Sequence, residues 1–178
     1  AADRARAAED RQRAAADRRL AARDRQQANA ELERAHLDVL TGAYLRGMGE
    51  MALGHEIARA QRADARLVFA FVDVDGLKAV NDAGGHEAGD RLLRSVAEAI
   101  QSKLRSYDPI VRVGGDEFAC ALADADLEDA VIRFDEIQAS LETGSFSVGL
   151  TEMRADDSVT DLMKRSNDEM RRVRAASR

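Results

Sequence analysis

IVRVGGDEFACAL, residues 110–122, is the stretch of sequence that decides the fold. Two short apolar runs, at residues 110–113 and 118–122, flank the four residues Gly-Gly-Asp-Glu. Glycines and acids between two apolar runs are typical of a tight β-hairpin. We therefore expect the carboxylates of Asp116 and Glu117 to lie at the turn of this hairpin.

The apolar pattern on both sides of the hairpin predicts an alternation of strands and helices. Upstream, an unbroken apolar run ends at Asp73, and Gly84 and Gly85 indicate a loop before the next helix. The expected elements from residue 67 onward lie at residues 67–72, 87–104, 110–113, 118–122, 127–141, 146–150 and 159–176, after an amphipathic helix at residues 46–62. This order predicts an α/β (α+β) domain, with a mixed central sheet and helices on one main face.

The first 37 residues repeat with a period of seven. An Asp-Arg pair recurs at this interval, at Asp3, Asp10, Asp17 and Asp24. Such heptads are typical of a coiled coil, although the seam is mostly alanine, which buries little area, and a solvated single helix stays an alternative. We expect a coiled-coil dimerisation helix at residues 1–37, a separate domain at residues 38–178, and a homodimer formed through the helix.

Composition and charge exclude several classes of protein. A net charge of -6 over 178 residues argues against binding to nucleic acid or to an anionic membrane, which requires basic residues gathered on one face. Cys120 lies in an apolar run, which favours a buried thiol in a reducing compartment. The run at residues 67–72 is far shorter than the about 20 residues of a membrane-spanning helix. Since the sequence starts without methionine, we expect a cytoplasmic fragment whose upstream sensor or membrane region is missing.

Three carboxylates are expected at one edge of the sheet, because Asp73 ends a buried strand and the hairpin turn carries Asp116 and Glu117. Mg²⁺ binds carboxylate and phosphate oxygens, and Lys78 nearby indicates a nucleotide-phosphate site. An ordinary polar turn is the alternative. A calcium EF-hand loop does not fit, because Gly84 stands where its bidentate glutamate is needed. A phosphatase of the haloacid-dehalogenase type, with Asp73 as the nucleophile, also stays open.

Several motifs in order resemble the GGDEF family of diguanylate cyclases. RVGGDEF at residues 112–118 contains the family signature, and DVDGLKAVND at residues 73–82 is similar to its upstream motif, which GHEAGD at residues 85–90 continues. DVLTG at residues 38–42 resembles the turn that starts the family's domain, and SVG at residues 147–149 resembles its late strand. The resemblance implies a nucleotidyl-cyclase-like mixed central sheet surrounded by helices, in which two GTP molecules are joined into cyclic di-GMP and two pyrophosphates are released.

The resemblance also implies the catalytic residues. The family's metal ligands correspond to Asp73, the backbone carbonyl of Val74, Asp116 and Glu117, with Mg²⁺ or Mn²⁺ as the cofactor. Glu117 is in addition a candidate for activating the attacking 3′-hydroxyl. The metal would stabilise the nucleophile and the charge on the pyrophosphate that leaves.

Contacts with GTP are implied at Lys78, Asn81, Asp90, Gly114, Gly115, Arg174 and Arg178. The basic residues match phosphate-binding positions, Asn81 and Asp90 match the positions that read guanine, and the glycines let the backbone approach the phosphates.

The chain departs from the family at four places that surround this site. Ser166-Asn167 replaces Ala-Asp, Arg174 replaces lysine, Ser177 replaces glycine, and Leu77 replaces an aromatic residue. These departures bear on the affinity for the triphosphate, because arginine and lysine differ in reach and in hydrogen-bonding geometry.

RSYD at residues 105–108 stands where the family has its inhibitory RxxD site. The resemblance implies that Arg105 and Asp108 bind guanine of the product, so that cyclic di-GMP inhibits its own synthesis. A surface ion pair is the alternative interpretation. Two further functions stay open for the whole chain: a receptor that binds cyclic di-GMP or GTP without catalysis, and a pure oligomerisation module.

Overall fold

The computed structural model of the chain describes residue 23 and residues 36–176. The chain divides into two units, residues 1–36 and 37–178, and the described residues belong almost entirely to the second. Arg23 is helical and exposed. The predicted coiled coil at residues 1–37 otherwise lies outside the described residues, so the dimerisation helix and the boundary at residue 38 stay predictions.

Within the described residues, five strands form one sheet in the order β1-β3-β4-β2-β5. They are β1 (Tyr44–Leu45), β2 (Leu67–Val74), β3 (Ile110–Gly114), β4 (Glu117–Ala123) and β5 (Phe146–Glu152). β1 is parallel to β3, whereas the other neighbours are antiparallel, so the predicted mixed sheet is confirmed. β3 and β4 form the predicted hairpin.

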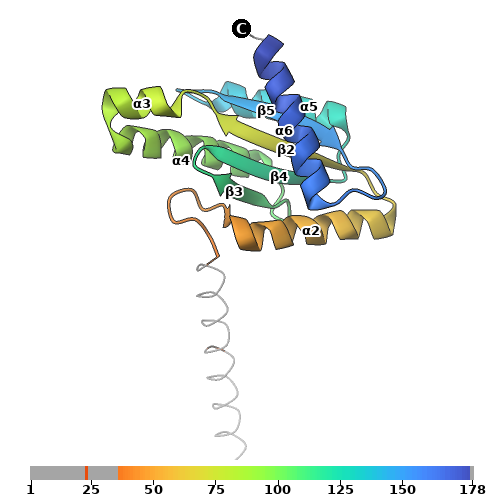
Figure 1. Cartoon of the computed structure of the whole chain (residues 1–178). Helices are drawn as coiled ribbons and strands as arrows, with labels where there is room; N and C mark the ends of the chain where they lie inside the picture. Colours follow the sequence, from red (N-terminus) through yellow and green to blue (C-terminus); the bar gives the residue numbers. More distant parts are fainter. Residues whose placement is uncertain (1–22, 24–35, 177–178) are drawn as a thin grey trace, which may run out of the picture. The chain divides into compact units, whose positions relative to one another are not determined.

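Helices cover both faces of the sheet (Figure 1). One face packs against α2 (Arg46–Ala63) and α6 (Val159–Ala176), and the other against α4 (His86–Lys103) and α5 (Leu127–Ser140). The prediction of helices on one main face is therefore wrong. β2 gives the physical reason, because all of its residues 67–72 are buried and alternate side chains point to opposite faces. A strand that is apolar at every position has to be covered on both sides.

A short helix, α3 (Leu77–Gly84), occupies most of the segment that was predicted as a loop. Leu77 and Val80 lie one turn apart and pack, partly buried, against the core. Gly85 separates α3 from α4 with a φ of 74°, a conformation that glycine adopts without strain. The two glycines thus mark a boundary between two helices.

α6 packs on the sheet at very short range, and its last turns project beyond the strands in Figure 1. A Cβ atom built on Gly149 of β5 would lie 1.9 Å from the carbonyl oxygen of Ser166 and 2.4 Å from the backbone nitrogen of Met170. Only glycine permits this approach. The position of α6 is therefore set by β5, and with it the position of the residues at the end of α6.

The domain begins with a closed turn at residues 37–44. The carboxylate of Asp38 accepts hydrogen bonds from the backbone nitrogen of Thr41 at 2.9 Å and from its hydroxyl at 2.7 Å. The backbone of Asp38 is bonded to Ala43 and to Gly42. This turn leads the chain directly into β1 and α2.

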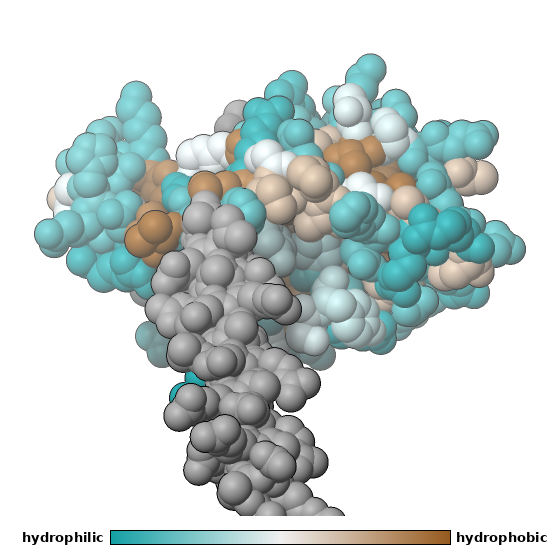
Figure 2. Space-filling view, turned by 90° about the horizontal axis from the view of Figure 1, so that it is seen from below, coloured by the Kyte–Doolittle hydropathy of each residue, from teal (hydrophilic) through white to brown (hydrophobic). Residues whose placement is uncertain are grey.

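The remaining surface and core agree with the composition. Cys120 is fully buried, as predicted, and burial raises the pKa of its thiol. No helix within the described residues is both long and apolar enough to span a bilayer. Seen from below, hydrophobic side chains show between hydrophilic ones and do not form one continuous area (Figure 2).

Candidate active site

The backbone brings the predicted catalytic residues of β2 and of the hairpin together. Asp73 is the cross-strand partner of Glu117, and the amide of Val74 donates a hydrogen bond to the carbonyl oxygen of Asp116 at 3.0 Å. The prediction that these three acids meet at one edge of the sheet is confirmed at the level of the backbone. The antiparallel register of β2 and β4 is what carries Asp73 to the hairpin turn.

The side chain of Asp73 is bound to Arg174 from the last turn of α6. Nη1 of Arg174 donates to Oδ1 of Asp73 at 2.6 Å, and Nη2 lies 3.0 Å from Oδ1 of Asp75. The Asp73 side chain is 17% exposed and that of Arg174 37%, so water screens this ion pair only in part. One guanidinium therefore bridges two carboxylates that stand two residues apart.

Asp75 is a member of the site that sequence reasoning did not assign. Its two carboxylate oxygens accept from the hydroxyls of Ser145 and Ser147, each at 2.9 Å, and its amide donates to the carbonyl oxygen of Ser145 at 2.9 Å. These bonds tie Asp75 to β5. The Asp-x-Asp spacing in the sequence could have assigned Asp75 to the site, because side chains two residues apart in an extended chain lie on the same face.

Several opposing influences act on the pKa of Asp73. Loss of water around the group raises its pKa, the charge and the hydrogen bond of Arg174 lower it, and the neighbouring charges of Asp116 and Asp75 raise it again. The net result is a raised pKa. Burial is the largest of these influences, and together with the neighbouring acids it outweighs the effect of Arg174.

The donors present here suit a hard divalent cation. Carboxylate oxygens and a backbone carbonyl are the ligands that Mg²⁺ and Mn²⁺ take, and a positive group, Arg174, already lies between Asp73 and Asp75. In the described part of the chain, however, no three histidine, cysteine, aspartate or glutamate side chains are grouped so that they could hold a metal ion. The side chains of Asp73 and Asp75 thus surround the guanidinium of Arg174. The backbone pairing of Asp73 with Glu117 is nevertheless the one that the predicted metal site needs.

Arg112, a residue of the signature that was given no role, fixes the hairpin turn. Its Nη2 and Nε donate to the carbonyl oxygen of Gly115 at 2.7 and 3.3 Å, and its Nη1 donates to Asp38 at 3.0 Å. Burial alone would raise the pKa of Asp38, but the bonds from Thr41 and Arg112 outweigh it and lower that pKa. Arg112 therefore links the turn at residues 37–44 to the acidic turn.

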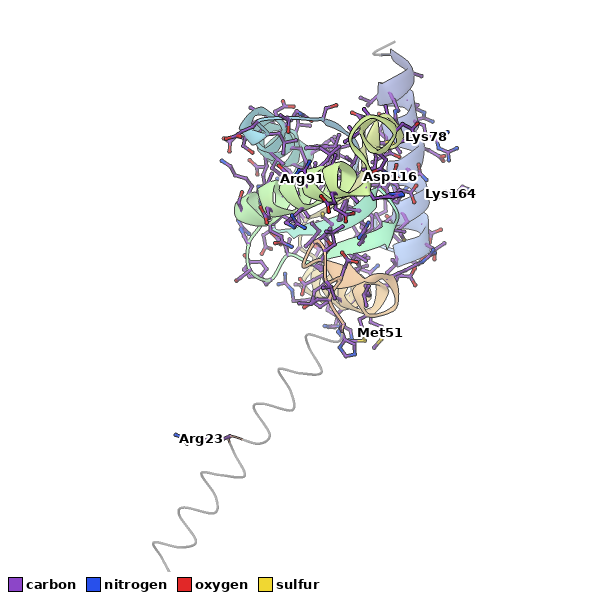
Figure 3. The ribbon with its side chains drawn as sticks, turned by 90° about the vertical axis from the view of Figure 1, so that its left-hand side faces the viewer. Arg23, Met51, Lys78, Arg91, Asp116 and Lys164 are labelled. Carbon is purple, nitrogen blue, oxygen red and sulfur yellow. The ribbon has the colours of Figure 1, made fainter. Side chains whose placement is uncertain are left out.

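The predicted phosphate contacts are spread over three elements. Lys78 lies exposed on the first turn of α3, and it projects on the same side of the domain as Asp116 and as Lys164 of α6 (Figure 3). A Cβ built on Gly115 would meet no atom within 4 Å, whereas one on Gly114 would lie 3.2 Å from Oε2 of Glu117. The backbone at Gly115 is therefore open to a ligand. Arg178 lies outside the described residues.

The two predicted guanine contacts lie on neighbouring helices. Asn81 is on α3, and its Oδ1 is buried without a hydrogen-bond partner among the described residues. A Cβ on Gly89 of α4 would lie 2.0 Å from this oxygen, so glycine makes the room that the amide occupies. Asp90 is the next residue of α4 and is exposed. A buried acceptor without a donor is costly, which suits a ligand that brings the donor.

A cavity of about 520 Å³ adjoins Glu117 between α2 and α6. Lys164 and Asn167 of α6 line it together with Glu117. Oδ1 of Asn167 is buried and has no hydrogen-bond partner in the described part of the chain. One of the substitutions that separate this chain from the family, Asn167, thus lines the same cavity as Glu117.

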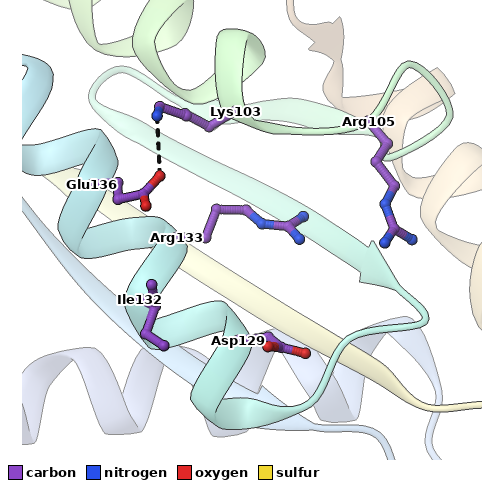
Figure 4. A pocket seen from close by; sticks show the side chains of 6 residues that line it. All are labelled: Lys103, Arg105, Asp129, Ile132, Arg133 and Glu136. Carbon is purple, nitrogen blue, oxygen red and sulfur yellow. Dashed lines mark hydrogen bonds and ion pairs between the residues drawn. The ribbon is translucent and has the colours of Figure 1, made fainter.

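The predicted inhibitory site lies by a second cavity, of about 290 Å³, at the end of α4 (Figure 4). Arg105 and Arg133 line it, and in Figure 4 the side chain of Arg133 points across the cavity toward the guanidinium of Arg105. Arg133, which sequence reasoning missed, has its Nη1 buried without a hydrogen-bond partner among the described residues, and this nitrogen forms a long ion pair of 3.9 Å with Oδ2 of Asp108. Two arginines on one cavity are suited to bind a phosphate or a guanine edge.

Asp108 has a structural position in the same loop. Its side chain has no exposed surface, and its two oxygens accept from the backbone nitrogens of Arg105 at 3.0 Å and of Ala123 at 3.1 Å. It does not line the cavity of Figure 4. In this conformation Asp108 holds the loop that carries Arg105, and the guanidinium of Arg105 itself donates to Tyr107 and to the carbonyl oxygen of Ala123.

Comparisons with known proteins point to one family. The sequence model of the family described as "Diguanylate cyclase, GGDEF domain" matches residues 35–178. A probable diguanylate cyclase of Escherichia coli, DgcJ, is 31% identical over 140 residues, which are 75% of this chain and 28% of that protein. The chain therefore spans less than a third of the length of this curated relative.

Two solved structures have the same fold. Diguanylate cyclase SiaD of Pseudomonas aeruginosa, solved with its activator SiaC, has a TM-score of 0.76 and 31% identity, over 96% of this chain and 72% of that one. The coiled coil and GGDEF domain of DgcB from Caulobacter crescentus, solved with cyclic di-GMP, has a TM-score of 0.81 over 93% of this chain and 94% of that one. At 23% identity the second likeness shows the fold alone.

Proposed function

This chain belongs to the GGDEF family of diguanylate cyclases, and on that premise we propose that it joins two GTP molecules into cyclic di-GMP and releases two pyrophosphates. The observation that carries the proposal is the register of β2 and β4, in which Asp73 stands opposite Glu117 beside the turn of the hairpin.

The acids that this strand register brings together would bind the metal ion and take up a proton. Asp73, the carbonyl of Val74, Asp116 and Glu117 would hold Mg²⁺ or Mn²⁺, which supplies charge stabilisation for the attacking oxygen and for the leaving pyrophosphate. Glu117 accepts the proton of the 3′-hydroxyl of one GTP. The new bond joins that oxygen to the α-phosphorus of the second GTP, while the bond from this phosphorus to the pyrophosphate breaks.

The remaining predicted residues position the nucleotide. Asn81 and Asp90 read the edge of guanine, and the unpartnered Oδ1 of Asn81 supports this role because guanine carries donors. Lys78 and Arg174, with Arg178, hold the triphosphate, and the open backbone at Gly115, next to Gly114, lets it come close.

Catalysis requires two domains that face each other, because each domain holds one GTP. We infer that the helix at residues 1–37 forms a homodimer and raises the effective concentration of one domain for the other. Deletion of residues 1–36 is expected to lower the turnover per subunit most strongly at low protein concentration. Unchanged turnover over a dilution series would rule out this role of the helix.

Feedback inhibition by cyclic di-GMP is proposed at the loop of Arg105 and Asp108. The cavity between Arg105 and Arg133 supports it, because both side chains line it. Asp108 contributes through its bonds to the backbone on both sides of this loop.

The test of the reaction is incubation of the purified chain with GTP and Mg²⁺, followed by mass spectrometry for cyclic di-GMP. Glu117→Ala is expected to abolish product, whereas Glu142→Ala, which removes an exposed acid far from the hairpin in sequence, serves as the matched control. Asp73→Ala is expected to weaken the binding of GTP in the presence of Mg²⁺. Absence of product from the unsubstituted chain at every protein concentration would contradict the proposal.

A receptor for GTP or cyclic di-GMP is the second candidate. Two features favour this second candidate: the ion pair of Arg174 with Asp73, and Asn167 in place of the family's aspartate. Both alter the surroundings of the catalytic carboxylates. A receptor would bind nucleotide in a calorimetric titration and yield no cyclic di-GMP in the experiment above.

A further inference from the structure

Arg174 has a partner that a phosphate-binding arginine does not need. It is bonded to Asp73, the first of the proposed metal ligands, and to Asp75. We propose that Arg174 is an internal cation of the active site: it neutralises Asp73 until a divalent metal ion takes its place, and the released guanidinium then binds the triphosphate of GTP. This inference rests on the proposed function and adds to it a coupling between metal binding and nucleotide binding.

The geometry of the contact is specific to arginine. Asp73 and Asp75 stand two residues apart at the end of β2, and two different nitrogens of one planar group reach them, at 2.6 and 3.0 Å. A guanidinium presents its donors as a rigid fork, whereas the ammonium group of lysine is a single point of charge. The substitution of the family's lysine by Arg174 is therefore what allows one side chain to hold both acids.

The two acids are not equivalent partners. Asp75 is fixed by the hydroxyls of Ser145 and Ser147 and by its own backbone, so it stays in place whatever Arg174 does. Among the described residues, the side chain of Asp73 accepts one hydrogen bond, which comes from Arg174. Asp75 is thus a positioning residue that keeps the guanidinium at the site, and Asp73 is the partner that a metal ion can take over.

The local charge leaves room for a divalent ion. Two carboxylates, those of Asp73 and Asp75, share one guanidinium, and Glu117 stands opposite Asp73 in the sheet. One guanidinium offsets only part of this negative charge. A divalent ion brings twice the charge of Arg174, so the exchange of the two cations is favourable in sign.

The backbone of Arg174 stays where it is during this exchange. The close contact of Gly149 with Ser166 and Met170 fixes α6 one turn before Arg174. Only the side chain has to turn, and a long, partly exposed side chain can do so on a fast timescale. The same residue can therefore serve the acids first and the triphosphate later.

The experiment measures Mn²⁺ binding in the absence of nucleotide, by the electron paramagnetic resonance of free Mn²⁺. Removal of the internal cation by Arg174→Met is expected to tighten Mn²⁺ binding by about tenfold, a size typical of a charge-assisted hydrogen bond that is partly screened by water. Arg171→Met removes an equal charge from an exposed position of the same helix and is the matched control, with less than about a twofold change expected. Arg174→Lys keeps the charge but cannot bridge both acids, so an intermediate affinity is expected.

A second titration uses a GTP analogue that has a methylene group between its α- and β-phosphates. In the unsubstituted chain, Mn²⁺ is expected to strengthen the binding of this analogue by more than the same ion does in Arg174→Met, because the ion also releases the arginine. The difference between these two enhancements measures the coupling directly.

The outcomes separate this inference from the function on which it rests. Unchanged or weaker Mn²⁺ binding in both Arg174→Met and Arg174→Lys overturns the internal cation, even if the analogue still binds and cyclic di-GMP is still made. Equal tightening in Arg171→Met also overturns it, since the effect would then be one of general charge. Loss of Mn²⁺ and analogue binding from the unsubstituted chain would instead overturn the proposed function.

Discussion

Replacement of Gly149 by alanine adds one methyl group at the tightest contact between the sheet and α6. The new carbon would lie 1.9 Å from the carbonyl oxygen of Ser166, 2.4 Å from the backbone nitrogen of Met170 and 2.8 Å from its Cβ. Atoms of a helix backbone cannot turn away as a side chain can, so α6 has to move by about 1 Å. Overpacking of this kind costs about 1–3 kcal/mol, and we expect the upper end because the obstacle is backbone.

Thermal unfolding followed by circular dichroism measures this cost. For a chain of this size about 3 kcal/mol corresponds to a fall of about 6–12 °C in Tm. The control is Gly54→Ala in α2, where the new Cβ would make an ordinary contact of 3.6 Å with Val159. In a helix interior this change is expected to stabilise by about 0.5–1 kcal/mol. A Tm of Gly149→Ala within about 2 °C of the unsubstituted chain would refute the reasoning, because α6 would then be free to adjust.

Three further predictions concern the site and its surroundings. Gly89→Ala puts a Cβ 2.0 Å from Oδ1 of Asn81, so we expect GTP binding measured by calorimetry to weaken by at least about tenfold; an unchanged affinity would show that Asn81 does not contact guanine. Arg105→Ala is expected to raise the concentration of cyclic di-GMP that halves the turnover by about tenfold or more, and an unaltered inhibition curve would exclude this site. The lowered pKa of Asp38 means that its ionised form stabilises the fold above the ordinary value of 3.8, and this stability is lost as the pH falls through the lower pKa of the folded state. Urea unfolding between about pH 2 and 5 should therefore show a smaller loss of stability on acidification in Asp38→Asn, and parallel curves for the two proteins would contradict it.

The sequence predicts the elements of the fold well where the apolar pattern is long or where turn residues are distinctive. The hairpin follows from the two apolar runs around Gly114-Gly115, and α6 from a periodicity that extends over 18 residues. The prediction that helices cover one main face is wrong because residues 67–72 lack alternation of apolar and polar residues, and this lack indicates burial on both sides. α3 was missed because a helix of 8 residues next to two glycines has little periodicity to read.

The site divides in a similar way. Motif order was enough to predict that Asp73 would stand near Glu117, because β2 and the hairpin belong to one sheet. The bridge from Arg174 to Asp75 depends on the close packing of α6 on Gly149, which is a matter of a few tenths of an ångström and has no trace in sequence spacing. The burial of Asp108 was likewise invisible, because the Arg-x-x-Asp pattern does not say whether its acid faces the backbone or the solvent.

The side chain of Arg112 connects the first turn of the domain to the turn that carries the acids. One end of its guanidinium holds Asp38 and the other holds the carbonyl oxygen of Gly115. A rotation at residue 38 must either move Gly115 as well or break the hydrogen bonds of Arg112. The start of this domain and its reactive turn are for this reason one mechanical part, so a displacement at residue 38 would also displace the turn that carries the acids.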